Sequence, residues 1–145
     1  MLSKKAKYAI KALIFLGKNY GEEPIRISEI ATEEHIPQKF LEQILLLMRN
    51  AGLLYSKKGA GGGYSLNKSP KDIFLTEVIH LIDGRIAMVP CVSEDFYQRC
   101  TECKEEATCG IRDVFSEVEK AMLAILSGTS IHDIIKREEK LKSRK

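Results

Sequence analysis

The sequence has no tryptophan, and phenylalanine and tyrosine together make up only 7% of its 145 residues. It has no apolar run near the roughly 20 residues that a membrane-spanning helix needs. Residues 8–16 follow three lysines, as in a secretory signal, but Lys11 interrupts the run and no small-x-small cleavage site follows. We therefore expect a cytoplasmic protein with no membrane partner, whose four cysteines are thiols or metal ligands rather than disulfides.

The residue sets that mark most enzymes are also missing. The chain shows no Ser/His/Asp set, no paired carboxylates and no strand-to-helix cofactor loop. Its Cys-x-x-Cys, from Cys100 to Cys103, does not stand between a strand and a helix as in thioredoxin-like proteins. We expect no catalysis, and a thiol redox enzyme stays only as a weaker hypothesis.

Net charge is small, at +3, but it is unevenly distributed. Residues 1–70 carry eleven Lys and Arg against six Asp and Glu, whereas residues 71–145 carry twelve against fourteen. A basic first half joined to a mildly acidic second half is typical of a module that faces an anionic partner and is joined to a second part with another role.

Apolar residues at helical spacing predict a first helix over Ser3–Asn19, which Gly21 ends. Pro24–Ile27 reads as a short extended segment. A second, shorter helix is expected after this extended segment.

Two further helices joined by a tight turn follow. Ser28 is a suitable N-cap for a helix over residues 29–34, and Pro37 suits the first position of a helix over residues 38–51. Gly52 is then a natural C-cap. Since the second helix has one apolar face and one long-armed polar face, the pair predicts a helix-turn-helix.

The stretch "KKGAGGGY", residues 57–64, suggests a backbone built to approach phosphate closely. A P-loop needs its lysine after the glycines, and a dinucleotide fingerprint needs a following helix; neither context is present. Residues 53–56 and 64–66 instead read as two strands of a hairpin. A basic hairpin tip after a helix-turn-helix predicts a winged helix, whose Lys57 and Lys58 reach a nucleic-acid backbone.

The second half predicts a helix over 75–82 capped by Thr76, irregular chain over 83–109, a long helix from residue 111, and a shorter one from Ser130. Residues 136–145 read as a frayed, solvated tail. One continuous apolar stripe is expected on the long helix, formed by Ile111, Val114, Phe115, Val118, Met122, Ile125 and Leu126.

These residues carry a family resemblance. The segment "FLEQILLLMRNAGLLYSKKGAGGGYSL" resembles the recognition helix and wing of the Rrf-two family of bacterial transcription regulators, the group of IscR, NsrR and CymR. The segments "KAKYAIKALIFL", "RISEIA" and "CGIRDVFSEVEKAMLAILSGTSIHDI" are similar to the same family, so that the resemblance covers residues 2–135.

The resemblance implies a fold that is mainly α with a small β-hairpin. Its parts are a winged helix-turn-helix domain (1–82), a cysteine-rich sensor loop (83–110), a dimerisation helix region (111–135) and a tail (136–145). It also implies a homodimer on double-stranded DNA with an imperfectly palindromic operator, since two dyad-related helices read two major-groove segments. The residues expected to contact DNA are Gln38, Lys39, Glu42, Gln43, Arg49, Lys57, Lys58, Gly59 and Gly61.

Four cysteines lie within nineteen residues of polar, irregular chain: Cys91, Cys100, Cys103 and Cys109. Free cysteines normally pack as small buried hydrophobes, which a polar loop does not favour. The spacing does not form two separate Cys-x-x-Cys knuckles, so a structural zinc site is less favoured. Iron–sulfur clusters accept cysteine ligands at irregular spacings.

In the resembled family, many members hold an iron–sulfur cluster with three cysteines just before the long helix. Cys91, Cys103 and Cys109 match those three ligands, so the resemblance implies a [2Fe–2S] or [4Fe–4S] cluster, which an apo form would lack. Cys109 also directly precedes the long helix, whose N-terminal dipole favours the thiolate that metals bind.

The sequence departs from that pattern. The gap after the first cysteine is long, Cys100 is extra, Arg112 replaces a histidine that some members carry, and Lys7 occupies the position of an acidic ligand in others. The fourth ligand stays open: Cys100 is the first candidate, and His35, which reads more readily as a turn residue, is the second.

The function predicted is a sequence-specific DNA-binding transcriptional regulator, a repressor in the first instance, controlled by a cysteine-ligated cluster. The alternative is a cluster-free regulator of the same fold that responds to thiol oxidation at Cys100 and Cys103, or to a small molecule.

Overall fold

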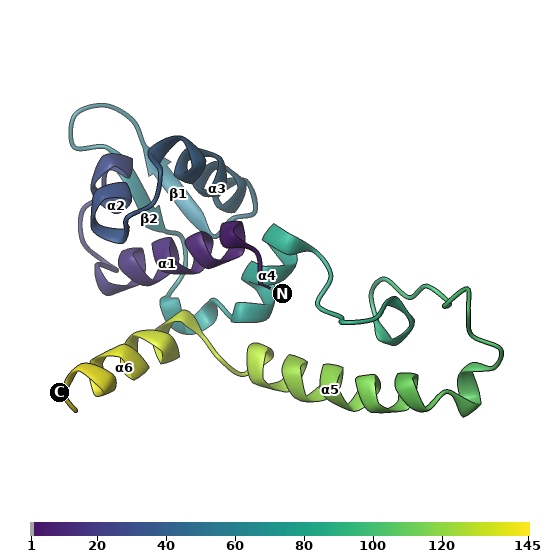
Figure 1. Ribbon diagram of the computed structural model, residues 1–145. Helices are drawn as coiled ribbons and strands as arrows, with labels where there is room; N and C mark the ends of the chain where they lie inside the picture. Colours follow the sequence, from purple (N-terminus) through teal and green to yellow (C-terminus); the bar gives the residue numbers. More distant parts are fainter. Residues whose placement is uncertain (1) are drawn as a thin grey trace.

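The computed structural model describes residues 2–145. A body of helices and one hairpin carries a long helix that projects away from it, and an irregular loop runs alongside that helix (Figure 1). In chain order the elements are α1 (Lys4–Lys18), α2 (Ile27–Glu34), α3 (Gln38–Asn50), β1 (Leu54–Lys57), β2 (Gly63–Leu66), the 3₁₀ turn η1 (Pro70–Asp72), α4 (Leu75–Asp83), the turns η2 (Pro90–Val92) and η3 (Glu106–Thr108), α5 (Gly110–Ser127) and α6 (Ile131–Lys142).

The core of the body forms where α1, α3 and the hairpin meet. The apolar face predicted for α3 is buried there, and Leu41, Ile44, Leu45 and Met48 have no exposed surface. Phe40 lies at the edge of this face and packs edge-on against Tyr8 of α1, with ring centroids 5.7 Å apart. Burial of one face of α3 leaves its polar face pointing to solvent.

The helix-turn-helix is present, but both helices begin differently from the prediction. The N-cap of α2 is Arg26 rather than Ser28, because Ile25 is held in a β-bridge to Tyr64 and the helix starts as soon as the chain leaves it. Pro37 is the N-cap of α3 and not its first residue. Between the helices, His35 adopts a left-handed conformation, with φ 53° and ψ 48°.

The end of α3 sets the direction of the hairpin. Gly52 has φ +82°, which favours glycine, and its N–H bonds to the Arg49 carbonyl at 3.0 Å. The N–H of Leu53 bonds to the Met48 carbonyl at 3.0 Å, which completes a Schellman motif. The chain then enters β1, which pairs antiparallel with β2, with Leu54 opposite Leu66.

The glycines of the wing have two different roles. Gly59 and Gly61 have φ of +88° and +73° at the tip and face open space, so they serve the turn itself. Gly63 has φ +153°, and a Cβ there would lie 2.3 Å from the carbonyl oxygen of Ile25. Gly63 therefore allows Ile25 to pair with Tyr64 and to extend the sheet.

Gly63→Ala is expected to destabilise the protein by about 3 kcal/mol, the upper end for overpacking against fixed atoms, because only backbone could move to admit the methyl group. Gly61→Ala is the matched control: its cost is that of a left-handed alanine, about 1 kcal/mol. Thermal unfolding of both variants measures the difference, and equal losses would show that the Ile25–Tyr64 pairing is unimportant for stability.

The segment before α4 is joined to the segment before α6. Phe74 forms a β-bridge with Ser130, and the N–H of Ile131 bonds to the Ile73 carbonyl at 2.8 Å. The N-cap of α4 is consequently Phe74, not Thr76 as predicted, because the pairing holds residue 74 extended up to the start of the helix.

Helix α6 extends to Lys142, so a frayed tail from residue 136 was wrong. A capping box between Ser130 and Asp133 fixes its start. Ile131 and Ile135 are buried against the body, and a Cβ on Gly17 of α1 would lie 3.0 Å from Ile135 Cδ1. Packing against α1 therefore stabilises α6 as a helix, which its lysine-rich, exposed outer face does not predict.

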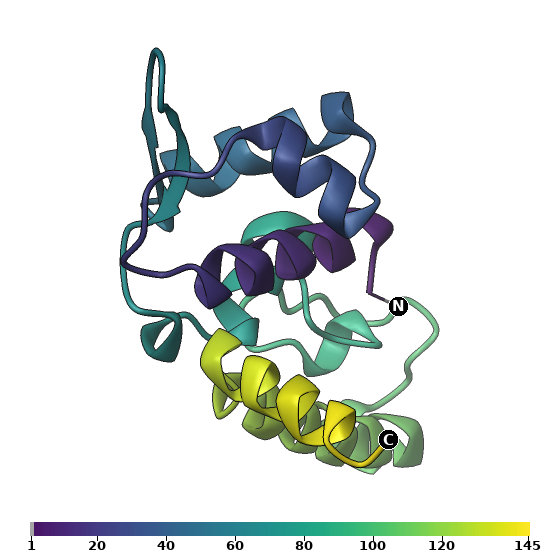
Figure 2. The ribbon, with the colours of Figure 1, turned by 90° about the vertical axis from the view of Figure 1, so that its left-hand side faces the viewer.

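Helix α5 projects away from the body in Figure 1, and in the view of Figure 2 it is seen behind α6. The seven apolar residues predicted for its stripe lie on one side of the helix, within an arc of about 120° at 3.6 residues per turn, and the rest of the chain covers only one edge of this stripe. Phe115, Met122 and Leu126 are half-buried within the chain. The other edge of the stripe is exposed and includes Ile111 (67%), Val114 (57%), Val118 (38%) and Ile125 (65%).

Candidate DNA interface and cysteine cavity

The polar face of α3 presents the residues expected to read DNA. Gln38, Lys39, Glu42, Gln43 and Arg49 are all exposed on this helix. Arg49 also donates from Nη1 to Ser56 Oγ of β1 at 3.3 Å, which links α3 to the hairpin. Long polar side chains on one exposed helix face suit hydrogen bonding to base edges in a major groove.

Leu46 is a residue of this face that the sequence analysis missed. It is 45% exposed and lies four residues after Glu42, whereas the other leucines of α3 face the core or its edge. The sequence could have indicated its exposure, because Leu46 does not follow the helical spacing of the buried residues of α3. An exposed apolar group among side chains that are expected to read bases suits contact with a thymine methyl.

The hairpin projects beyond the helices as a narrow loop (Figure 2). Lys57, Lys58, Gly59 and Gly61 are exposed along it. Residues 38–61 contain Lys39, Arg49 and these two lysines against one acidic residue. This balance gives α3 and the wing one positive surface, as phosphate contact requires.

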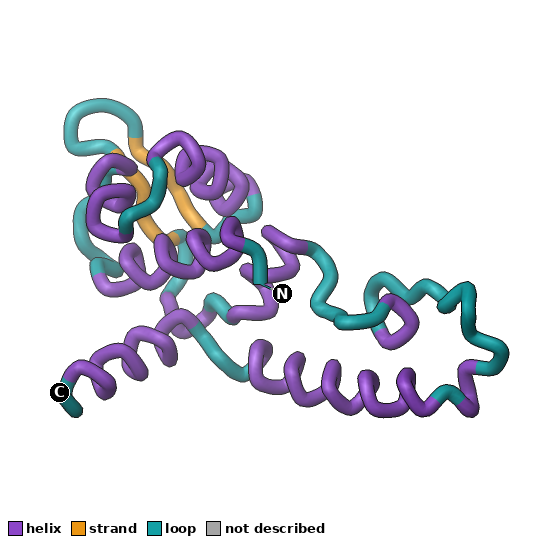
Figure 3. Tube along the Cα trace, in the orientation of Figure 1, coloured by secondary structure: helices purple, strands orange, loops and turns teal. Residues whose placement is uncertain are grey.

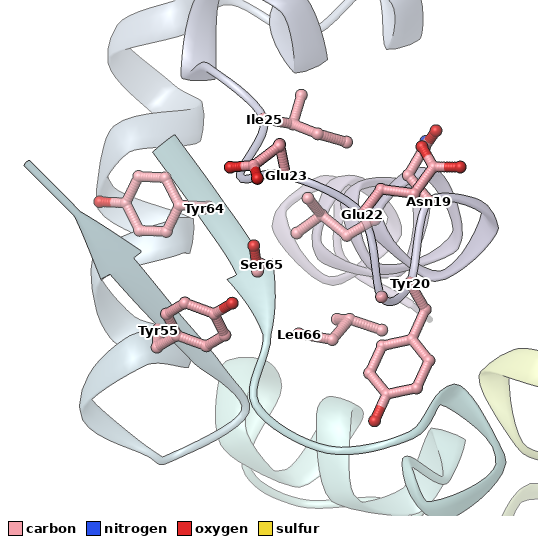
Figure 4. Close-up of a pocket in the computed structure, with 11 residues that line it drawn as sticks. Asn19, Tyr20, Glu22, Glu23, Ile25, Tyr55, Tyr64, Ser65 and Leu66 are labelled. Carbon is pink, nitrogen blue, oxygen red and sulfur yellow. The ribbon is translucent and has the colours of Figure 1, made fainter. Parts of the chain in front are cut away.

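A hollow at the base of the hairpin is acidic, in contrast to this positive surface. Figure 4 shows it between the end of α1 and the strands, with Tyr20, Tyr55 and Tyr64 around it. Its volume is about 350 Å³, and Glu22 and Glu23 line it as well. Two carboxylates make this side of the domain less suited to phosphate contact than α3 and the wing tip.

The loop between α4 and α5 has little regular structure (Figure 3). Even so, it gathers all four cysteines around one cavity of about 460 Å³. Chain segments far apart in the loop thus contribute to one site: Cys91 lies within η2, Cys100 and Cys103 lie in a turn, and Cys109 precedes α5.

Helix α5 supplies the fixed wall of this cavity. Cys109 is the N-cap of α5, and its Sγ accepts a hydrogen bond from the backbone N–H of Arg112 at 3.5 Å. Arg112 Nε donates to the Cys91 carbonyl at 3.2 Å. One residue therefore ties the first and last cysteines to the start of α5.

Other contacts hold the loop in a defined path. The Tyr97 hydroxyl donates to Glu106, and the guanidinium of Arg85 lies 5.4 Å from the ring centroid of Phe96. The hydrogen bond to Glu106, with a smaller contribution from burial, raises the pKa of Tyr97. Exposed contacts of this kind are individually weak, so they leave the loop able to reorganise.

Two of the thiols favour their protonated form. A hydrogen bond from Cys100 Sγ to Glu102 Oε2, at 3.1 Å, raises the pKa of Cys100. Burial, with the nearby Cys109, raises the pKa of Cys103. Metals bind the thiolate form, and a disulfide also forms from the thiolate. Metal binding and disulfide formation at these cysteines should therefore become more favourable as pH rises.

The donor set fits a polynuclear cluster better than a single ion. Among residues 2–145, no group of three or more His, Cys, Asp or Glu side chains could hold one metal ion. A zinc site requires four ligands around a single point, whereas cysteines of an iron–sulfur cluster bind different irons. Four thiols line one cavity here, so sulfur ligands for such a cluster are available.

The other candidate ligands lie elsewhere. His35 is exposed in the helix-turn-helix turn and does not line the cysteine cavity, whereas Cys100 does. Lys7 is exposed on α1. Within one chain, Cys100 is thus the only candidate named for the fourth position that shares the cavity with the other three cysteines.

A known protein family shares this architecture over almost the whole chain. The Rrf2 family model, described as "Iron-dependent Transcriptional regulator", matches residues 2–137. The chain belongs to the Rrf2 family. An rrf2-like HTH-type transcriptional regulator of Rhodobacter capsulatus is 42% identical over 138 residues, which cover 93% of this chain and 92% of that protein.

Solved structures of Rrf2-family regulators have the same fold. CymR of B. subtilis, titled the Global Cysteine Regulator, superposes with a TM-score of 0.80 at 29% identity, covering 94% of this chain and 97% of that one. IscR of T. potens has a TM-score of 0.75 at 25% identity, covering 97% and 90%. The expected fold, mainly α with a winged hairpin, is confirmed.

Membership also confirms the class of function. Rrf2-family proteins are DNA-binding transcriptional regulators and not enzymes. This excludes the hypothesis of a thiol redox enzyme, which was based on the Cys-x-x-Cys motif. None of the helices in residues 2–145 is long and apolar enough to cross a bilayer.

Proposed function

We propose that this Rrf2-family regulator acts as a homodimeric repressor on an imperfect palindrome, under the control of an iron–sulfur cluster held by its four cysteines. The observation that carries the proposal is that Cys91, Cys100, Cys103 and Cys109 line one cavity at the start of α5. The family's description as iron-dependent supports the same reading.

Dimerisation is proposed through the exposed face of α5. Ile111, Val114, Val118 and Ile125 follow a three-and-four spacing along it, which is the pattern of a helix–helix seam. Pairing of two such helices would place two copies of α3 and the wing on one side of the dimer. Each copy would then read one half-site of the operator.

The four cysteines are proposed to act on this dimer through α5. When bound, an iron–sulfur cluster supplies a link that is lost on oxidation or when iron is scarce. Arg112 and Cys109 join the cavity to the first turn of α5, so reorganisation of the loop reaches the proposed seam directly. A change in the seam alters the spacing of the two recognition helices, and with it the affinity for a palindrome of fixed length.

Absorption spectra of the protein purified with and without air test the proposal. A visible iron–sulfur band that oxygen bleaches is expected. The second candidate, a switch through a Cys100–Cys103 disulfide, is favoured by the turn in which the Cys103 N–H bonds to the Cys100 carbonyl at 3.3 Å. It predicts a colourless protein whose thiol count falls on oxidation.

The DNA-contact residues give a separate prediction. Lys58→Ala should weaken binding to every sequence and lower the log–log salt slope by about one unit, because one phosphate contact is lost. Lys71→Ala removes the same charge from η1, away from the wing, and should leave the slope unchanged.

Glu42→Ala should instead relax sequence preference, since a carboxylate on α3 can accept from cytosine N4 and is worth about 1–3 kcal/mol of discrimination. Non-specific affinity should change little. Mobility-shift titrations on operator and random DNA measure both quantities, and an equal loss on both would assign Glu42 no role in base reading.

A further inference from the structure

A second cavity lies between α4, the segment after η2, and α5, where the projecting helix leaves the body of the protein. Its volume is about 240 Å³, roughly eight water molecules at about 30 Å³ each. No cysteine lines it among the described residues. Its walls are Thr76 and His80 of α4, Ile86, the loop residues Ser93, Glu94 and Asp95, and Glu119, Leu123 and Ser127 of α5.

The cavity is strongly acidic in a protein whose net charge is +3. Glu94, Asp95 and Glu119 converge on it, and within residues 2–145 no lysine or arginine lines it. The one basic group is His80, whose Nε2 lies 3.8 Å from Asp95 Oδ2. Carboxylates of like charge around one hollow produce a negative potential that attracts cations.

Glu119 is the unusual member of this set. Its exposed fraction is 5%, and in the part of the chain that the structure describes it makes no hydrogen bond. Burial, followed by Glu94 and Asp95, raises the pKa of Glu119. A buried carboxylate without a partner is costly, which makes this position hard to explain by packing alone.

Thr76 supplies a second unpartnered group on the opposite wall. Its Oγ1 is fully enclosed and has no hydrogen-bond partner among residues 2–145, whereas the Glu119 carboxylate keeps some contact with solvent. Buried hydroxyls are ordinarily satisfied, so such an atom calls for an explanation. Thr76 and Glu119, two residues whose side chains have no hydrogen-bond partner among residues 2–145, thus line one cavity from α4 and from α5.

We propose that this cavity binds a small organic cation with a primary ammonium group. An ammonium group has three N–H donors, which can serve the Glu119 carboxylate and neighbouring acceptors together. Ile86 and Leu123 give the cavity an apolar wall for a short alkyl chain. A metal ion is disfavoured, because no group of three or more His, Cys, Asp or Glu side chains in residues 2–145 could hold one.

The position of the cavity would allow a bound ligand to affect DNA binding. Thr76 and His80 belong to α4, which packs on α1 in the body, whereas Glu119 belongs to the helix proposed to form the dimer. A cation that joins the two walls would fix the angle at which α5 leaves the body. This effect needs neither the cysteines nor a cluster.

Calorimetric titration of the full-length protein with n-butylammonium chloride at neutral pH tests the site. The matched controls are n-butanol, which has the same chain without the charge, and sodium chloride at equal ionic strength. Saturable binding of n-butylammonium alone is expected. Equal heats from n-butanol, or saturable binding of Mn²⁺ in place of n-butylammonium, would overturn the proposal.

Variants locate the binding. Glu119→Gln should weaken n-butylammonium binding at least about tenfold, because a charge-assisted hydrogen bond is lost. Glu117→Gln, an exposed position on the same helix, should bind as the native protein does. If Glu119→Gln does not fold, Asp95→Asn on an exposed side chain should weaken binding about threefold. Native affinity in a folded Glu119→Gln or in Asp95→Asn would refute the site.

Discussion

Val118→Glu is expected to convert the protein to a monomer that no longer binds its operator specifically. Val118 is 38% exposed in the single chain and lies between Val114 and Ile125 on the outer face of α5. In a paired seam its side chain would be desolvated, and burying an unpaired carboxylate costs several kcal/mol. Loss of the dimer removes one of the two half-site contacts, which a palindrome requires together.

Sedimentation velocity and a mobility-shift assay measure the two effects. Lys120→Gln is the matched control, because it also changes the charge by one unit but lies on another exposed face of α5. It should remain a dimer. Val118→Glu should stay folded, since Val118 has no part in the core, and an intact Val118→Glu dimer would place the interface elsewhere.

Removal of the cysteines is expected to have a comparably large effect on control. Cys91→Ala, Cys103→Ala and Cys109→Ala should each prevent cluster assembly and should produce the same altered DNA preference. Typical coupling between two sites changes affinity about 5–150-fold, and the operator affinity should change within this range. Cys100→Ala should behave likewise if Cys100 is the fourth ligand, or otherwise leave a labile cluster.

Anaerobic reconstitution of the four variants, with iron and sulfide assays beside a DNA titration, makes the comparison. Thr108→Ala is the matched control, since Thr108 is exposed and adjoins Cys109 without lining the cysteine cavity. It should assemble the cluster normally. If all the cysteine variants bind operator identically with and without iron, the cysteines do not sense it.

The parts of the fold that the sequence predicted well are those whose determinants are local. The apolar residues of α3 repeat at its own helical period, and Gly52 directly follows it with the positive φ that glycine favours. The glycine-rich hairpin between short strands is equally local. The family resemblance depended on the same segments, and for that reason it placed the DNA-reading face on α3 and the wing.

Tertiary structure decided the features that depend on distant partners. The start of α2 follows from the pairing of Ile25 with Tyr64, and the length of α6 follows from packing of Ile135 near Gly17. Helix periodicity placed one apolar stripe on α5, but it did not show that the rest of the chain covers only one edge of that stripe. Nor did it reveal Glu119, whose charge predicts an exposed position and whose burial arises only where α4, the loop and α5 enclose it.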